Sequence, residues 1–150
     1  MSLKQKIIDD LKAAMKAGDA AKRDTLRMLD SMAKNAEIEK KKREEGLADE
    51  EMIEVIARAI KQRRDSISQY EAGGRADLAE KEKEEIKILS VYLPEQMSEE
   101  AVRAEVKKIV SDLGLSTRAE IGRAMGEAMT RLKGKAEGGL VKKMMEEELK

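Results

Sequence analysis

The stretch YLPEQMSEE, Tyr92 to Glu100, holds the only proline of a 150-residue chain. Proline lacks a backbone N–H and disfavours helical geometry at the preceding Leu93, so a helix that reaches this point must end there. Four residues later Ser98 is a good N-cap, and Met97 and Val102 have the spacing of a hydrophobic staple. We therefore predict a helix stop, a short connector and a helix start, with a domain boundary between residues 94 and 95.

Residues 1–94 contain four segments with apolar residues at helical spacing. The first follows Ser2 as N-cap and ends at Gly18, and the second follows Asp19. The third runs from Asp49 to Gly73, and the fourth is charged at first and apolar at its end. Short turns between the segments favour an antiparallel helical bundle. The expected inward-facing residues are Leu3, Ile7, Leu11, Ala14, Met15, Leu26, Leu29, Met32, Ala33, Ala36, Ile53, Ile56, Ile60, Ile67, Tyr70, Ile86, Leu89 and Leu93.

Residues 95–150 contain three shorter amphipathic segments. Gly114 and Gly134 are expected to end the first two, and Thr117 with Glu120 can form a capping box at the start of the second. The apolar stripes comprise Val102, Val106, Ile109, Leu113, Ile121, Met125, Ala128, Leu132, Val141, Met144 and Met145. The chain is thus predicted to be all-α, with an N-terminal antiparallel helical bundle (1–94) followed by a small three-helix C-terminal domain (95–150).

Composition narrows the range of functions. The chain has 31 basic and 31 acidic residues and no His or Cys. Disulfides, thiol catalysis, zinc sites of the usual Cys/His type and a histidine general base are therefore excluded. The longest uncharged run, Ile88 to Pro94, is far shorter than the ~20 residues of a membrane span. We expect a soluble, cytoplasmic protein with no membrane partner, no metal and no cofactor. The many carboxylates lie on polar helix faces, so no catalytic residue is assigned.

The most concentrated charge in the first half is the run EIEKKKREEG, Glu37 to Gly46. Its basic part could bind phosphates. Its acidic flanks, with pairs such as Glu39 and Arg43 at i,i+4 spacing, favour a solvated helix end that projects into water.

Two glycines stand out in RAEIGRAMGEAM, Arg118 to Met129. Gly122 and Gly126 lie four residues apart inside a predicted helix, where each costs about 1 kcal/mol relative to Ala. Two explanations remain open. Another helix could pack closely against the glycines, or a ligand backbone such as a phosphodiester could approach them.

Charge is locally unbalanced around these glycines. Between residues 116 and 143 there are seven basic and three acidic residues, a local +4 in a chain of zero net charge. Such a footprint is typical of modest nucleic-acid affinity. Because the segment has no aromatic residue for base stacking, recognition of the shape and backbone of folded RNA fits better than single-strand binding.

Three motifs resemble the GatB/YqeY family: the junction YLPEQMSEEAV, the helix TRAEIGRAMGEAM and the turn LKGKAEGGLVKKM. The similarity extends to the N-terminal MSLKQKIIDDLKAAMKAGD and to RDTLRM at residues 23–28. In larger relatives a domain like residues 95–150 forms the tail of the B subunit of glutamyl/aspartyl-tRNA amidotransferase, which contacts tRNA. The resemblance implies an all-α fold and tRNA-facing positions at Gly122, Arg123, Met125, Gly126, Lys133, Gly134 and Lys135. The local charge adds Arg118, Arg131 and Lys142.

Three functions are compatible with these features. The first is a non-catalytic tRNA-binding module, accessory to a protein of aminoacyl-tRNA metabolism. The second is a helical protein-interaction module whose glycine face docks a partner helix. The third, a carbon–nitrogen ligase with glutamine as amido donor, rests on the family label alone, because the chain resembles neither the kinase-like domain of the B subunit nor a glutaminase.

Overall fold

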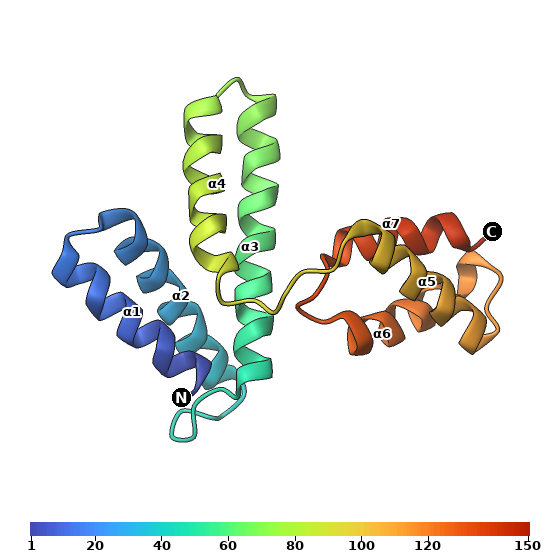
Figure 1. Ribbon diagram of the computed structural model, residues 1–150, viewed down its shortest axis with the longest axis horizontal. Helices are drawn as coiled ribbons and strands as arrows, with labels where there is room; N and C mark the ends of the chain where they lie inside the picture. The colour runs from blue at the N-terminus through green and yellow to red at the C-terminus, as the bar shows by residue number, and fades with distance from the viewer. The chain divides into compact units, whose positions relative to one another are not determined.

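The computed structural model describes all 150 residues and is entirely helical, with no strand (Figure 1). The elements are α1 (Leu3–Ala17), α2 (Ala20–Glu39), α3 (Asp49–Ala72), α4 (Ala76–Ser90), α5 (Glu99–Leu113), the 3₁₀ helix η1 (Arg118–Glu120), α6 (Ile121–Leu132) and α7 (Gly138–Glu148). They form two compact units, Met1–Leu93 and Pro94–Lys150. The all-α prediction is confirmed. Whether the two units fold as independent domains stays a prediction.

The predicted capping residues stand at the starts and ends of the helices as expected. Ser2, Asp19 and Ser98 accept the backbone N–H three residues ahead at 3.1, 3.1 and 3.2 Å. Gly18 and Gly114 follow α1 and α5 with φ of 70° and 64°, the left-handed geometry that glycine adopts without steric cost. Local sequence chemistry is therefore enough to set these helix ends.

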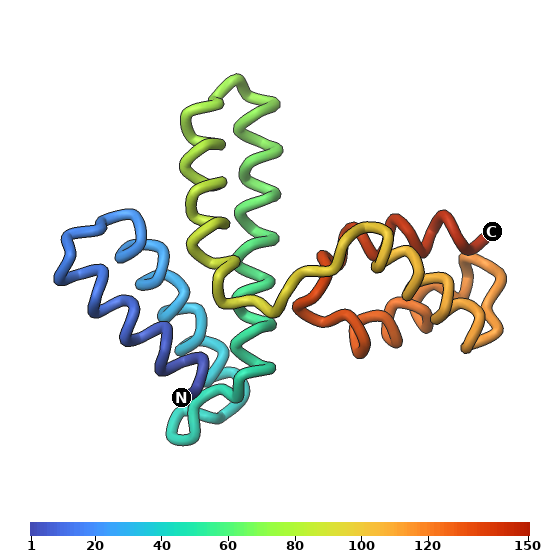
Figure 2. The backbone as a smooth tube through the Cα atoms, viewed as in Figure 1, coloured from blue at the N-terminus to red at the C-terminus, as the bar shows by residue number.

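The N-terminal unit consists of two antiparallel hairpins, α1–α2 and α3–α4, whose backbones can be followed in Figure 2. Its core is aliphatic except for Tyr92, which is 5% exposed. The Tyr92 hydroxyl donates to Asp10 at 2.5 Å, and Lys6 lies 5.7 Å from the ring centroid. Burial, then the hydrogen bond to Asp10, raises the pKa of the tyrosine. These contacts tie the end of α4 to α1.

The buried face of α3 differs from the predicted one. Ile56 and Ile60 are buried as expected, whereas Ile53, Ile67 and Tyr70 are only half-buried. The side chains buried instead are Met52, Val55, Ala59 and Arg63. The spacing of the isoleucines did not predict the buried face correctly, because the core side of α3 also carries the cation of Arg63.

Arg63 is 4% exposed and lies where α2, α3 and α4 meet. Its guanidinium donates to Glu85 at 3.0 Å, to the Ala59 carbonyl at 3.0 Å and to the Met28 sulfur at 3.1 Å. Burial and the neighbouring Glu85 raise the pKa of Glu82 on the same side of α4. A buried charge is tolerated here because it is both paired and hydrogen-bonded.

The prediction that residues 37–46 form a helix end in water holds for the exposure of most of the segment but fails at Glu37 and for the helical conformation beyond Glu39. Glu37 is 5% exposed and forms an ion pair with Lys4 of α1. The helix ends at Glu39, so Glu39 and Arg43 are not an i,i+4 helical pair. The following loop folds back onto the start of α3. Periodicity could not reveal this because the partners lie far away in the sequence.

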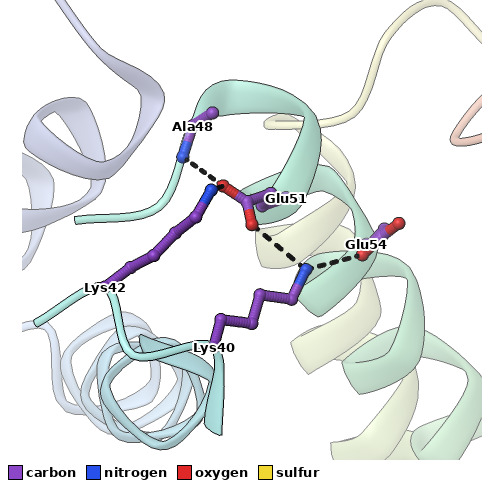
Figure 3. A network of polar contacts seen from close by, with 5 residues as sticks. All are labelled: Lys40, Lys42, Ala48, Glu51 and Glu54. Atoms are coloured by element: carbon purple, nitrogen blue, oxygen red, sulfur yellow. Dashed lines mark hydrogen bonds and ion pairs between the residues drawn. The ribbon is translucent and has the colours of Figure 1, made fainter. Parts of the chain in front are cut away.

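Glu51 holds this loop in place (Figure 3). Its carboxylate accepts from Lys42 at 2.9 Å and from the Ala48 N–H at 3.0 Å, and Lys40 lies 3.1 Å away. Lys40 also reaches Glu54 at 3.5 Å. Lys42, then the backbone N–H and Lys40, lower the pKa of Glu51 from 4.5 to about 2. The run of lysines is thus used largely for internal contacts.

The C-terminal unit packs α5, α6 and α7 around its own core. The buried residues are Val102, Val106, Ile109, Leu115, Ala124, Ala128, Leu132, Val141, Met144, Met145 and Leu149. Before α6 the chain makes the short η1 turn, where Glu120 accepts from the N–H groups of Ser116 and Thr117 at 3.3 Å each. The three-helix arrangement matches the pattern expected for this part of the chain.

We expect Glu51 to make stability sensitive to acid. Its folded-state pKa lies below the ordinary value, so its contacts stabilise the fold above pH 4.5 and lose that effect as the pH falls towards 2. Glu51→Gln should lower the urea midpoint at pH 7 and show a smaller further loss between pH 4.5 and 2 than the unmodified chain. Glu50→Gln, on the exposed side of the same turn, should keep the full acid loss. Identical acid profiles for Glu51→Gln and the parent would contradict this assignment.

Limited proteolysis tests the two-domain prediction. A Glu-specific protease should cut first after Glu95, in the exposed connector, or after Glu44 and Glu45 in the exposed loop before α3. Lys41 in that loop has φ of 56°, unusual for a residue with a side chain, so trypsin should cut there early. Fragments are identified by mass spectrometry. Early cleavage within Ile53–Tyr70 while the connector stays intact would contradict a boundary at this point.

Candidate functional site

Gly122 and Gly126 lie one turn apart on the solvent side of α6. A Cβ added to either glycine meets no atom of the chain within 4 Å. The opposite side of the helix carries the buried residues Ala124, Ala128 and Leu132. Hence no helix of the C-terminal unit packs against the two glycines, and close packing within that unit does not explain their presence.

The neighbours of these glycines include one cation, two methionines and the exposed Thr130, whose hydroxyl donates to the Gly126 carbonyl at 3.2 Å. Met129, three residues after Gly126 on the same side of α6, is 37% exposed, and Arg123 is exposed beside them. Met125 is half-buried and packs against the core. We call Gly122, Arg123, Gly126 and Met129 the glycine face. It is a flat strip of exposed backbone next to a guanidinium.

The turn after α6 carries Lys133, Gly134 and Lys135 and is held by the connector. Gln96 donates through its side-chain amide to the Gly134 carbonyl at 2.6 Å, and the Met97 N–H donates to the Lys135 carbonyl at 2.9 Å. Gly134 has φ of 74°, so a side chain there would be strained. The connector residues therefore position two exposed lysines, Lys133 and Lys135, directly after the glycine face.

Arg131 lies on the other side of α6 and already has anionic partners. It donates to Glu127 at 2.8 Å and to Asp112 at 3.2 Å, and Glu105 lies 4.0 Å away. The hydrogen bonds to Glu127 and then Asp112 raise its pKa. Its charge is thus largely compensated within the unit.

Arg118 and Lys142 also lie away from the glycine face. Arg118 donates to the carbonyls of Leu149 and Glu146 at 3.4 Å each, so its cation caps the C-terminal end of α7. Lys142 is exposed on α7.

The predicted site residues therefore fall into two groups. Gly122, Arg123, Met125 and Gly126 share one stretch of α6, and Lys133–Lys135 follow it in the next turn. Arg118, Arg131 and Lys142 do not join them on that stretch. The effective local charge is smaller than the +4 counted from the sequence, because Arg131 pairs with Asp112 and Glu105, which lie outside the counted segment.

Sequence reasoning missed Gln96 and Met129. Gln96 stands in the stretch that defined the boundary, yet its partner Gly134 is 38 residues away. The signal for Met129 was available, since it has the i+7 spacing from Gly122 on an exposed helix side.

A shallow groove of about 460 Å³ lies between α5 and α6. Met97 and Leu132 supply its apolar part, and charges of both signs surround them: Glu105, Lys108, Asp112, Arg131 and Lys135. No group of three or more acidic side chains is placed to hold a metal ion. None of the helices has the length and apolar character needed to cross a bilayer.

Comparison with known proteins identifies the family. A family model described as Yqey-like protein matches residues 4–149. The chain belongs to the YqeY-like family. The resemblance found in the sequence motifs is thereby confirmed for this family. That the tail acts like the tail of an amidotransferase B subunit stays a prediction.

Curated yeast proteins named "Altered inheritance of mitochondria protein 41, mitochondrial" resemble this YqeY-like chain. The Kluyveromyces lactis protein is 43% identical over 107 residues, 69% of this chain and 56% of that protein. The Vanderwaltozyma polyspora protein is 37% identical over 106 residues, again 69% and 56%. The Saccharomyces cerevisiae (strain YJM789) protein is 35% identical over 124 residues, 79% and 65%. The match thus spans little more than half the length of the first two relatives.

The names of the yeast relatives correct the expected cellular location. The cytoplasmic location inferred from composition is contradicted, because the relatives are named as mitochondrial proteins. The inference failed because a cysteine-free, highly charged helical chain is compatible with any reducing aqueous compartment.

We expect Gly122→Ala and Gly126→Ala each to raise the stability of this YqeY-like chain by about 0.5–1 kcal/mol. Both glycines are helical, neither has a positive φ, and an added methyl group meets open space. Gly114→Ala is the matched control, because its methyl group also meets open space but its φ is +64°, so it should destabilise. The melting temperatures of the three variants and the unmodified chain test this prediction. A loss of stability in either α6 variant would show that the glycines are needed for packing.

Proposed function

We propose that the C-terminal unit is a non-catalytic module that binds the phosphodiester backbone of folded RNA, with tRNA as the first candidate. The observation that carries the proposal is the exposure of Gly122 and Gly126 on a face that no other part of the C-terminal unit covers. The resemblance of the same motif to a tRNA-contacting tail supports the choice of RNA. By likeness to the yeast relatives, the proposed location is mitochondrial.

The chemistry of the face suits a phosphate backbone. Glycines let a phosphodiester approach the helix without a side-chain clash, and Arg123 can form paired hydrogen bonds with phosphate oxygens. Lys133 and Lys135 add two cations in a turn of fixed shape. Because the face has no aromatic side chain, we propose that it recognises shape and charge rather than bases.

A catalytic step is not part of the proposal. The chain has no His or Cys to act as base or nucleophile near neutral pH. A carbon–nitrogen ligase activity with glutamine as amido donor has only the family resemblance in its favour. We propose instead an accessory function beside a protein of aminoacyl-tRNA metabolism.

A second candidate is a protein-interaction module whose glycine face receives a partner helix. Met129, 37% exposed beside Gly126, favours it, because methionine adapts well to a helix packed closely against glycines. The two candidates differ in salt dependence, since only phosphate contacts release counterions in proportion to their number.

The experiment is a titration of bulk tRNA at several salt concentrations. Lys133→Glu with Lys135→Glu should weaken binding whatever the tRNA sequence and lower the log–log salt slope by about 1.8 where the contacted RNA is duplex-like. Gly126→Leu should weaken binding without lowering the melting temperature, because an added Cβ there meets open space and leucine is a better helix former than glycine. Duplex DNA of equal length serves as the competitor.

The matched control is Lys107→Glu with Lys150→Glu, which removes the same charge from exposed positions of the same unit away from the glycine face. It should leave the affinity within about twofold, as expected for distant surface charges. Equal affinity for the parent, the Lys133/Lys135 variant and Gly126→Leu would refute RNA binding by this face. A salt-independent complex with a protein helix that Gly126→Leu abolishes would favour the second candidate.

A further inference from the structure

The hairpin of α3 and α4 has a second, uncovered side in the N-terminal unit. On one side α2 contacts both helices, through Met28 and Arg63 for example. On another side a groove of about 560 Å³ runs between α3 and α4, lined by Arg64, Ile67, Ser68, Lys83, Ile86 and Lys87. No part of the proposed RNA-binding face takes part in it.

The groove combines an apolar floor with a basic rim. Ile67 and Ile86 are half-buried and form the floor, and Arg64, Lys83 and Lys87 provide cations along the edges of both helices. No acidic side chain is among the lining residues. A ligand that fills the groove must therefore be apolar at its centre and gains from negative charge at its margins.

The nearest acidic groups do not neutralise this rim firmly. Lys83 pairs with Glu71 at 3.0 Å and reaches Glu80 at 4.0 Å, and Lys87 pairs with Glu84 at 3.0 Å. The carboxylates of these pairs are more than half exposed. Exposed ion pairs of this kind are weak, so the lysines can exchange their partners for those of a ligand.

At this end of the hairpin α4 still buries Ala79, but α3 buries little. On α3 the last buried residue is Arg63, and the half-buried Ile67 lies outside the core cluster of the unit. Two helices alone bury little apolar surface, whereas a third helix laid between them would cover the floor of the groove.

We propose that this groove binds an amphipathic α-helix of a partner protein, with an apolar ridge and acidic residues along both flanks. The spacing of Arg64, Ile67 and Ser68 on α3 and of Lys83, Ile86 and Lys87 on α4 provides one continuous helical seam. A second copy of this chain is disfavoured because its own cations would meet the same cations across a two-fold axis. Nucleic acid is disfavoured because a charged phosphate backbone laid over the isoleucine floor would bury none of its apolar surface against an apolar partner.

The test uses the full chain with isoleucine methyl groups labelled for NMR. The probe is a synthetic helical peptide with leucine on one face and glutamate along both flanks, compared with the same peptide carrying lysine instead. The glutamate peptide should shift the methyl signals of Ile67 and Ile86 and leave those of the buried Ile7 and Ile109 unchanged. The lysine peptide should shift none of them.

Lys83→Glu with Lys87→Glu should weaken the glutamate peptide roughly tenfold at low salt, because both rim contacts become repulsive. The matched control is Lys12→Glu with Lys16→Glu, an exposed pair at the same i,i+4 spacing on α1, which should bind like the parent. Neither double variant should alter tRNA affinity, so failure here is distinguishable from failure of the proposed function.

Four results would overturn the proposal: no shift of Ile67 and Ile86 with the glutamate peptide, equal shifts with both peptides, the same shifts on titration with tRNA, or their disappearance when the protein alone is diluted. The last would assign the groove to self-association.

Discussion

Pro94 stands at the boundary between the two compact units, and the residues on each side of it are anchored within their own unit. Tyr92 is fixed to α1 through Asp10, and Gln96 and Met97 are bonded to the turn after α6. Three residues separate these anchors, and Pro94 keeps that backbone out of a helix. Gln96 and Met97, which follow the boundary closely, therefore position Lys133 and Lys135. A change in the connector would disturb the proposed RNA-binding turn without touching α6 itself, because Gln96 supplies the hydrogen bond to Gly134.

Structural features that depend only on residues adjacent in the chain could be predicted from the sequence. Helix caps at Ser2, Asp19 and Ser98, and left-handed glycines at 18 and 114, need only a few adjacent atoms, so short patterns identify them. Features that depend on distant partners could not. Glu37 is buried because Lys4 lies beside it, and Arg63 occupies the core side of α3 because Glu85 pairs with it. A hydropathy pattern places both charges in water, since it has no access to these pairs.

The candidate site likewise has features that the sequence could predict and features that it could not. Helical spacing placed the two glycines on one side of α6 but left open whether another helix covers them, and the count of seven cations overstated the charge available to a ligand. Arg131 is held by carboxylates on α5 and α6, and Arg118 caps α7. The net charge counted along a sequence estimates the charge available to a ligand only where the cations are not paired with acidic residues of the same chain. In a highly charged helical chain much of that charge is used to join its own elements, as Lys40 and Lys42 do at Glu51.

The cost of Gly122 and Gly126 is the strongest physical argument for a binding function. Together they make α6 less stable by about 2 kcal/mol than alanine would. That is a large fraction of what a three-helix unit of this size can supply. Glycines at a turn such as Gly114 are required by a left-handed backbone, but these two have ordinary helical geometry and open space around them. Inside the C-terminal unit no contact compensates for this cost, which supports our proposal that another molecule docks on a helix surface without side chains. Stability and binding are then opposed at these two positions: the alanine substitutions that strengthen the fold should weaken whatever docks there.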